Sequence, residues 1–277
     1  MNSSWWIGIV GGPLVLSGVA GCEAQTEARP QEKAGPAKPA ASAPEKPEAE
    51  VKRKLIGKNV YFETQGDVRR VVISATVCLR EGQLEGLLTR RGTKEHEYIL
   101  VMDADAKLVH AGLIGAGAKA GSPVRFEPKY MPASGTVIKV MVRYTDKDGK
   151  TVTRPAQEWM RDVRNKKDMP HDWVFAGSHF VQDPEDKDKP PYYLANQGDV
   201  ICCINMPGAM MDLPIKNSNS DPGLGDRVYD AHTERIPKMG TWVEVILEPV
   251  LDKEKKEEEK KPEKSEEEKK SSDKSDE

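Results

Sequence analysis

The 277-residue chain is poor in aromatic and apolar side chains, with 6% Phe, Trp and Tyr together and 37% hydrophobic residues in all. Both values are low for a globular protein. The deficit is concentrated towards the two ends of the chain, because residues 23–50 and 252–277 contain almost no large apolar side chain. We therefore expect one folded domain between two polar segments rather than two domains of similar size.

An excess of positive charge is also missing. The chain has 42 Lys and Arg against 45 Asp and Glu, which gives a formal net charge of −3. Residues 251–277 alone hold 9 Lys and 12 acidic residues, so the remainder balances at 33 basic against 33 acidic side chains. No basic excess is left to neutralise phosphates, and nucleic acid is not an expected partner.

Long hydrophobic runs are scarce, and the one that approaches a membrane span in length covers residues 5–21. Its glycines and Pro13 make it a poor spanning helix. It ends in Val19-Ala20-Gly21-Cys22, which resembles a bacterial lipobox. The first four residues contain no Lys or Arg, which a signal peptide normally has. A signal anchor and an ordinary secretion signal cut near Gly21 therefore remain alternatives.

The lipobox predicts that residues 1–21 are a lipoprotein signal peptide and that Cys22 becomes the lipidated first residue, carrying acyl chains such as palmitate. Two or three acyl chains anchor a protein stably to a bilayer. We expect the mature protein at the cell membrane or the outer membrane, with the membrane as its partner through the lipid anchor. The folded domain would be exported, either periplasmic or at the surface.

The segments on either side of the domain have the composition of disordered chain. Residues 22–54 are rich in Pro, Ala, Glu and Lys and predict an extended linker. Residues 251–277 are nearly all Lys, Glu, Asp and Ser and predict a solvated tail.

Between these segments, residues 55–250 predict an α+β fold with a mainly antiparallel sheet and few helices. Turn signals at Gly66-Asp67 and Asp148-Gly149 indicate two hairpins, and Asp103 is a plausible N-cap for a helix. Helices are expected at 83–89 and 104–117, and strands at 59–63, 70–79, 98–102, 124–127, 136–144, 150–153, 173–180, 199–205 and 241–248.

The three cysteines beyond Cys22 include no C-x-x-C pair, so thiolate zinc sites, iron–sulfur clusters and thioredoxin motifs lack their ligands. Cys78 lies in one predicted strand, and Cys202 and Cys203 are adjacent in another, where they face opposite sides. A disulfide between Cys78 and one of the other two is one interpretation, and buried free thiols are the other.

Histidine and acidic residues supply the only metal-site candidates. His96-Glu97 begins like the zinc motif H-E-x-x-H, but Leu100 stands where the second ligand must be. His96, His171 and His179, with Glu97 or Asp172 as carboxylate ligands, could form a metal site if the chain brought them together. Structural histidines are the alternative interpretation. Complete catalytic motifs such as G-x-S-x-G and the P-loop are absent, so no catalytic residue or cofactor is assigned.

Four segments that follow one another along the chain carry a resemblance to a known family: Val77–Gly82, Gly92–Glu97, Pro155–Trp159 and His171–Ser178. Together they resemble the YdjY-domain proteins, and the resemblance extends from about residue 59 to residue 250. The family consists of exported and often lipidated bacterial proteins that are common in planctomycetes, and it implies no activity. Some relatives carry ferredoxin-type descriptions, but this chain lacks the four cysteines that such a cluster needs.

Together these features predict a lipid-anchored cell-envelope protein whose exported domain binds an unidentified envelope protein or ligand, or has a structural role. The alternative function is an envelope enzyme, such as a metal-assisted hydrolase that uses the His, Glu and Asp residues above.

Overall fold

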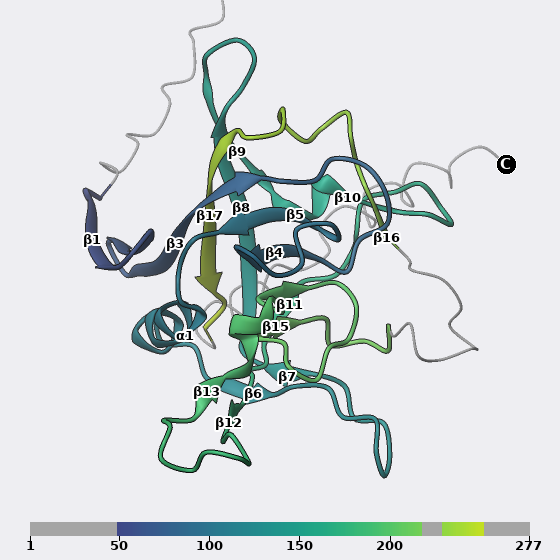
Figure 1. The fold of residues 1–277 in the computed structure, drawn as a ribbon. Coiled ribbons are helices and arrows are strands. Elements are labelled where there is room, and N and C mark those ends of the chain that lie inside the picture. Colours follow the sequence, from purple (N-terminus) through teal and green to yellow (C-terminus); the bar gives the residue numbers. More distant parts are fainter. Residues whose placement is uncertain (1–48, 218–228, 252–277) are drawn as a thin grey trace, which may run out of the picture. The chain divides into compact units, whose positions relative to one another are not determined.

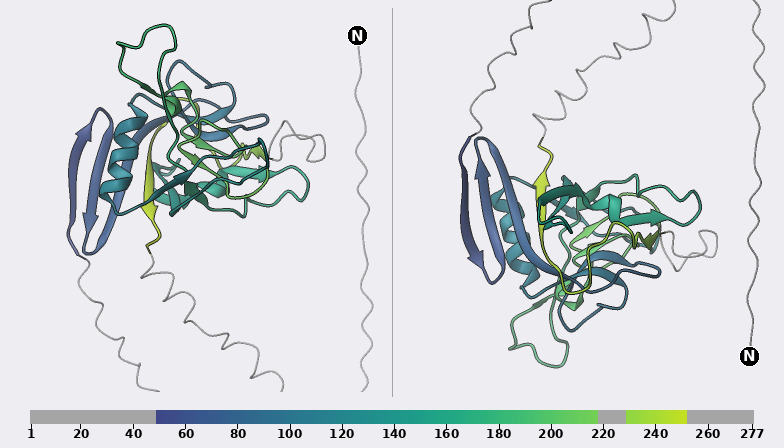
Figure 2. Two further views of the ribbon diagram at one scale, coloured as in Figure 1. Left: turned by 90° about the horizontal axis from the view of Figure 1, so that it is seen from below. Right: turned by 90° about the horizontal axis from the view of Figure 1, so that it is seen from above.

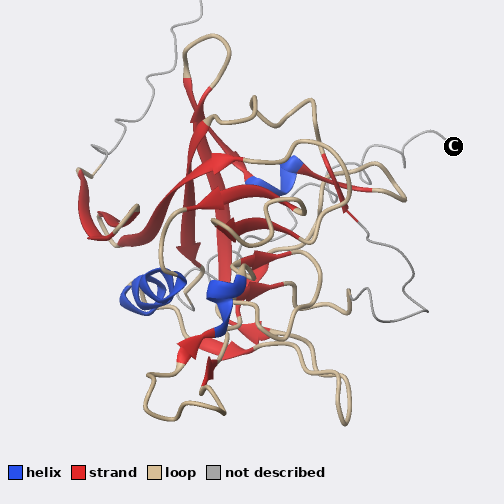
Figure 3. Ribbon diagram, viewed as in Figure 1, coloured by secondary structure: helices blue, strands red, loops and turns tan. Residues whose placement is uncertain are grey.

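The computed structural model describes residues 49–217 and 229–251, and most elements in this part of the chain are strands (Figure 3). The predicted signal peptide, Cys22, most of the predicted linker and the tail after Leu251 lie outside the described residues. Strands of the main sheet are β1 (Val51–Gly57), β2 (Val60–Gln65), β3 (Val68–Val77), β4 (Gly86–Arg90), β5 (Tyr98–Met102), β8 (Val137–Thr145), β9 (Thr151–Pro155), β11 (Trp173–Phe175), β14 (Ile201–Cys202), β15 (Met211–Asp212) and β17 (Trp242–Pro249).

The smaller elements attach to this sheet. The α-helix is α1 (Ala106–Gly115), and two short 3₁₀ helices are η1 (Ala156–Trp159) and η2 (Leu194–Gln197). Three two-stranded sheets pair β6 (Ala120–Ser122) with β7 (Ser134–Gly135), β10 (Met160–Asp162) with β16 (Tyr229–Ala231), and β12 (Phe180–Val181) with β13 (Tyr192–Tyr193).

Eight strands close into a barrel in the order β3-β17-β8-β11-β15-β14-β4-β5, because β5 pairs back onto β3 (Figure 1). The pairs β4–β5 and β14–β15 are parallel, and the other pairs are antiparallel. The mainly antiparallel sheet with few helices is therefore confirmed. Closure was not predicted, because it depends on long-range pairing such as that of Thr76 with Val101.

The core lies inside the barrel, because alternate side chains along each strand point inwards. On β17, Val243, Val245 and Leu247 are buried, while Trp242 and Glu244 face outwards. The interior also holds Trp159 and Trp173, which are fully buried. Burial of these large side chains supplies the main driving force for closing the sheet.

Beyond the barrel, β1 and β2 continue the sheet from β3, and α1 packs against this ribbon (Figure 2). The helix approaches the ribbon closely at Gly112, where a Cβ atom would lie 2.9 Å from the Val71 side chain. β1 begins at Val51, inside the predicted linker. The N-cap of α1 is Asp105 rather than Asp103, because the Asp105 carboxylate accepts the Lys107 N–H.

Three predicted elements are wrong. Residues 83–89 form no helix, because Gly86 to Thr89 are buried as β4 between β5 and β14. A short apolar run does not distinguish a helix from a buried strand. Residues 124–127 contain no strand and contribute only an isolated bridge at Arg125. The predicted strand 173–180 is broken at Gly177, whose φ of 94° is unsuitable for a continuous strand.

Candidate functional site

The segment Gly92–Glu97 forms the turn between β4 and β5 and directs its side chains to opposite sides. The Lys94 side chain is turned inwards and only 28% exposed, whereas His96 is 73% exposed. Glu95 closes the turn itself, since its carboxylate accepts the Thr93 backbone N–H at 2.9 Å. This turn therefore supplies its lysine, rather than its histidine, to the interior.

Lys94 lies at the centre of a polar cluster, here called the Lys94 cluster, that joins three separate segments of the chain. Its Nζ donates to Asp199 Oδ1 at 2.8 Å and lies 3.3 Å from Glu85 Oε2. The Tyr98 hydroxyl also donates to Asp199 Oδ1, at 3.2 Å, and lies 3.4 Å from Cys202 Sγ. The ammonium group thus neutralises two largely buried carboxylates.

The protonation states of the Lys94 cluster follow from burial and pairing. Burial raises the pKa of Glu85, and a hydrogen bond with the Glu97 carboxyl raises it further. Burial alone would lower the pKa of Lys94, but Asp199 outweighs it and the net direction is upward. Burial also raises the pKa of Tyr98 and of Cys202 well above their usual ranges. The phenol and the thiol therefore stay protonated at neutral pH, and the thiol is a poor nucleophile.

The predicted metal ligands lie in different surroundings. His96 is exposed in the turn before β5, 3.8 Å from the Glu97 carboxylate. The Gln157 side-chain amide donates to the His171 backbone carbonyl and to Asp172 Oδ1, while His179 lies beyond the break at Gly177. Within residues 49–217 and 229–251, no group of three or more His, Cys, Asp or Glu residues is arranged to hold a metal ion.

All three cysteines of the described domain are free thiols. Cys78 donates to the Tyr98 carbonyl at 3.1 Å, and burial raises its pKa to about 12. Cys202 and Cys203 point to different neighbours, Cys202 to the Tyr98 hydroxyl and Cys203 to the Leu84 carbonyl. The disulfide interpretation is therefore not realised in this structure, and the thiols act as small buried side chains.

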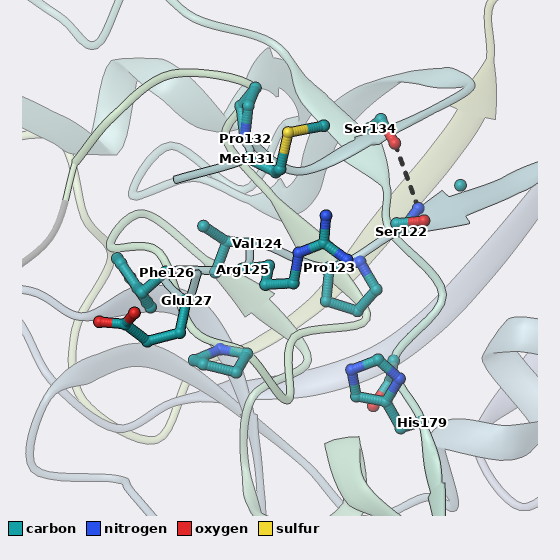
Figure 4. A pocket seen from close by; sticks show the side chains of 13 residues that line it. Ser122, Pro123, Val124, Arg125, Phe126, Glu127, Met131, Pro132, Ser134 and His179 are labelled. Carbon is teal, nitrogen blue, oxygen red and sulfur yellow. Dashed lines mark hydrogen bonds between the residues drawn. The ribbon is translucent and has the colours of Figure 1, made fainter. Parts of the chain in front are cut away.

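A cavity of about 580 Å³ opens at the end of the barrel where β6, β7 and β12 lie, at the bottom of Figure 1. Its walls come from the segment between β6 and β7, from the residues after the break at Gly177, and from the turn after β14 (Figure 4). The cavity is lined by Gly121, Ser122, Pro123, Val124, Arg125, Phe126, Glu127, Met131, Pro132, Ser134, Ser178, His179 and Pro207.

The wall formed by β6, β7 and the segment between them depends on two glycines. A Cβ at Gly121 would lie 2.1 Å from the Ser134 carbonyl oxygen, and a Cβ at Gly135 would lie 2.1 Å from the Phe175 carbonyl oxygen. Gly135 also has a φ of 143°, which favours glycine. The segment then turns back on itself, with the Arg125 N–H donating to the Met131 carbonyl at 3.0 Å. Backbone contact, rather than side-chain packing, sets the shape of this wall.

Another wall comes from the turn Met206–Ala209, which contributes Pro207 to the lining and rests on buried polar groups. Ala209 packs against Tyr98 and Cys202 of the Lys94 cluster. The Ser178 hydroxyl donates to the Gly208 carbonyl at 2.6 Å. Asp212, which is fully buried, accepts the Met206 N–H at 3.2 Å, and burial raises its pKa to about 7. The turn is therefore held by hydrogen bonds to ionisable and hydroxyl side chains, together with a backbone bond from the Ser178 N–H to the Ala209 carbonyl at 3.1 Å.

The wall segments present different chemistry to the cavity. Figure 4 shows Arg125 and His179 in the same space, although they come from different segments, with Glu127 at the far side. Within the described part of the chain, the Arg125 guanidinium has no ion-pair partner, so its charge is available to a ligand. Val124 forms an apolar floor and Met131 an exposed apolar rim. Sequence reasoning missed Arg125, because nothing in its local pattern marks it as part of a site.

The fold and this cavity define a mainly-β barrel domain with a loop-built cavity at one end. A family model described as the YdjY domain matches residues 63–248, from β2 to β17, and the chain belongs to the YdjY-domain family. Searches of curated proteins and of solved structures found no match. None of the helices in the described residues is long and apolar enough to cross a membrane.

Proposed function

We propose that this protein is a lipid-anchored cell-envelope protein whose YdjY domain binds a small ligand that has an apolar body and an anionic group. The observation that carries the binding role is the cavity of Figure 4, where Arg125 and His179 share one space with Val124 and Met131. A concave, mostly apolar surface with a few convergent polar groups is the usual form of a small-molecule site.

Binding, rather than serine catalysis, is supported by the state of Ser178 in the cavity. The Ser178 hydroxyl donates to the Gly208 carbonyl and accepts the Ala195 N–H, so its proton is directed away from His179. Ser134 Oγ accepts the Ser122 backbone N–H. A serine nucleophile needs a base within hydrogen-bond reach of its hydroxyl, and the Ser178 proton is donated to the backbone instead.

The anchor rests on Val19-Ala20-Gly21-Cys22, which lies outside the described residues. If Cys22 is lipidated, Cys22→Ser should block maturation and leave an unacylated precursor. Metabolic labelling with radioactive palmitate tests this in cells that produce each form. Equal incorporation into Cys22→Ser and the wild-type chain would refute lipidation at Cys22.

The cavity is tested by isothermal titration of the full-length protein with naphthalene-2-sulfonate, which combines a flat apolar body with one negative charge. Arg125→Gln should weaken its binding by about tenfold or more, since a hydrogen bond to a charged group contributes about 1.5–3 kcal/mol. The neutral naphthalene-2-sulfonamide should bind the wild type and Arg125→Gln equally. Arg154→Gln, at an exposed arginine on β9, is the matched control. Equal sulfonate binding by Arg125→Gln and wild type would exclude this cavity as the anion site.

A further inference from the structure

Trp242 differs from the other tryptophans of the described residues. Trp159 and Trp173 are 1% and 0% exposed, whereas Trp242 is 67% exposed at the start of β17. A single exposed apolar residue is not unusual by itself. Trp242, however, lines a cavity of about 350 Å³ on the outer face of the barrel, where its indole ring is available to a ligand.

A second cavity, of about 570 Å³, adjoins this one, and Tyr144 and Thr145 line both. Together they form a groove, here called the Trp242 groove, beside the hairpin of β8 and β9 at the top of Figure 1. The groove shares no lining residue with the cavity of Figure 4. Two adjoining cavities suit a chain of linked units better than one compact molecule.

The polar groups around Trp242 form a fixed array. Arg143 Nη2 lies 2.6 Å from Glu244 Oε2, and Arg53 Nη2 lies 2.6 Å from Glu244 Oε1. Burial would raise the pKa of Glu244, but the two arginines outweigh it and hold the pKa below its usual range. The hydroxyls of Ser74, Thr145 and Thr151 complete the lining. The indole ring is thus surrounded by hydrogen-bond donors and acceptors rather than by other exposed apolar groups.

We propose that the Trp242 groove binds a saccharide chain. A pyranose ring presents a flat face of C–H groups that packs on an indole ring by dispersion, and its edge carries hydroxyls that need donors and acceptors. The groove offers one aromatic surface with hydroxyl, guanidinium and carboxylate groups around it. A protein partner would instead favour a cluster of apolar anchors in a desolvated centre. The shared lining of the two cavities places a second sugar unit past Tyr144 and Thr145.

The test is isothermal titration of the full-length protein, kept in a sugar-free detergent, with chitotetraose, cellotetraose and tetragalacturonate. At least one should bind, and Trp242→Ala should weaken that binding at least tenfold. Trp242→Phe, which retains an aromatic face, should stay within a few-fold of wild type. Met239→Ala is the matched control, because Met239 is also exposed, at 59%, but does not line the groove. The three saccharides distinguish amino-sugar, neutral and acidic chains.

Two results would overturn the proposal. One is that none of the three tetrasaccharides binds at millimolar concentration, and the other is that Trp242→Ala binds as tightly as wild type. Naphthalene-2-sulfonate binding by Trp242→Ala should be unchanged, which shows that the variant is folded and separates this groove from the cavity of Figure 4.

Discussion

The two ends of the barrel are built by different means. At the end shown in Figure 4, irregular segments far apart in sequence meet around a cavity, and buried side chains such as Asp212 hold its walls. At the other end, the part of the Trp242 groove that holds Trp242 lies on the regular ladders of β3, β17, β8 and β9, where backbone pairing sets the positions of the lining residues. Each end therefore has its own sensitivity to mutation and to pH.

The two ends differ in the interactions that hold their side chains in position. Strand ladders position side chains through backbone hydrogen bonds, which do not titrate. The cavity wall depends on Asp212 and, through Ala209, on the Lys94 cluster, which contains ionisable groups in a largely buried setting. We expect mutations and pH changes to disturb the cavity end first.

The largest expected loss of stability is at Gly135, at the cavity end, and Gly149 at the other end provides the comparison. Gly135→Ala would place a Cβ against the Phe175 carbonyl, and we expect a loss of unfolding free energy on the order of 3–5 kcal/mol. Gly149→Ala is the control in the β8–β9 turn, where φ is 77° and no atom lies within 4 Å, and it should cost about 1–2 kcal/mol. Urea unfolding measures both. Equal losses would contradict the proposed role of close backbone contact at Gly135.

The pH dependence of stability should come largely from Asp212. Its pKa is raised from an ordinary 3.8 to about 7 by burial, so the folded state holds this proton more tightly than the unfolded state does. This stabilising contribution is present at low pH and is lost as pH rises from about 4 through about 7. We expect a decrease of about 2–4 kcal/mol over that range from this group.

Asp212→Asn removes the titrating group and should flatten this part of the profile. Urea unfolding of both proteins at pH 5 and pH 8 gives the comparison. Asp148→Asn, at the exposed β8–β9 turn, is the control and should keep the wild-type slope. If Asp212→Asn and wild type lose the same stability between the two pH values, another group carries the dependence.

Removing the central cation of the Lys94 cluster should have a smaller effect. Lys94→Met leaves Asp199 without its ammonium partner, and we expect a loss of about 1–3 kcal/mol because the pair is partly accessible to water. Lys147→Met, at an exposed lysine of the Trp242 groove, should change stability by no more than about 0.5 kcal/mol. Thermal unfolding distinguishes these outcomes. Similar stability losses in the two variants would refute the stabilising role of Lys94.

The smallest effect is expected at His96. Because its side chain is 73% exposed, His96→Ala should alter the free energy of unfolding by no more than about 0.5 kcal/mol. Chemical denaturation of His96→Ala and of Lys94→Met, measured in parallel, compares two residues of the same turn. A loss above about 1 kcal/mol at His96 would show that the histidine has a role that its exposure does not reveal.

Local features of the fold could be predicted well. The hairpin turns at Gly66-Asp67 and Asp148-Gly149 are confirmed, because a tight turn depends on residues adjacent in sequence. The helix predicted at 104–117 is confirmed as α1, Ala106–Gly115. The cavity was not predictable, because no local sequence pattern links Arg125 with His179. The two residues line one cavity only because the predicted strand 173–180 is interrupted at Gly177.

By itself, the sequence determined which part of the chain has enough apolar residues to fold, where its turns lie and which family it belongs to. These properties depend on composition and on near neighbours. Only the tertiary structure decided that β5 closes onto β3, that Lys94 rather than His96 faces inwards, and that Trp242 stays outside. Each of these depends on pairing between segments distant along the chain, where the register of one strand sets which side chains of another become buried.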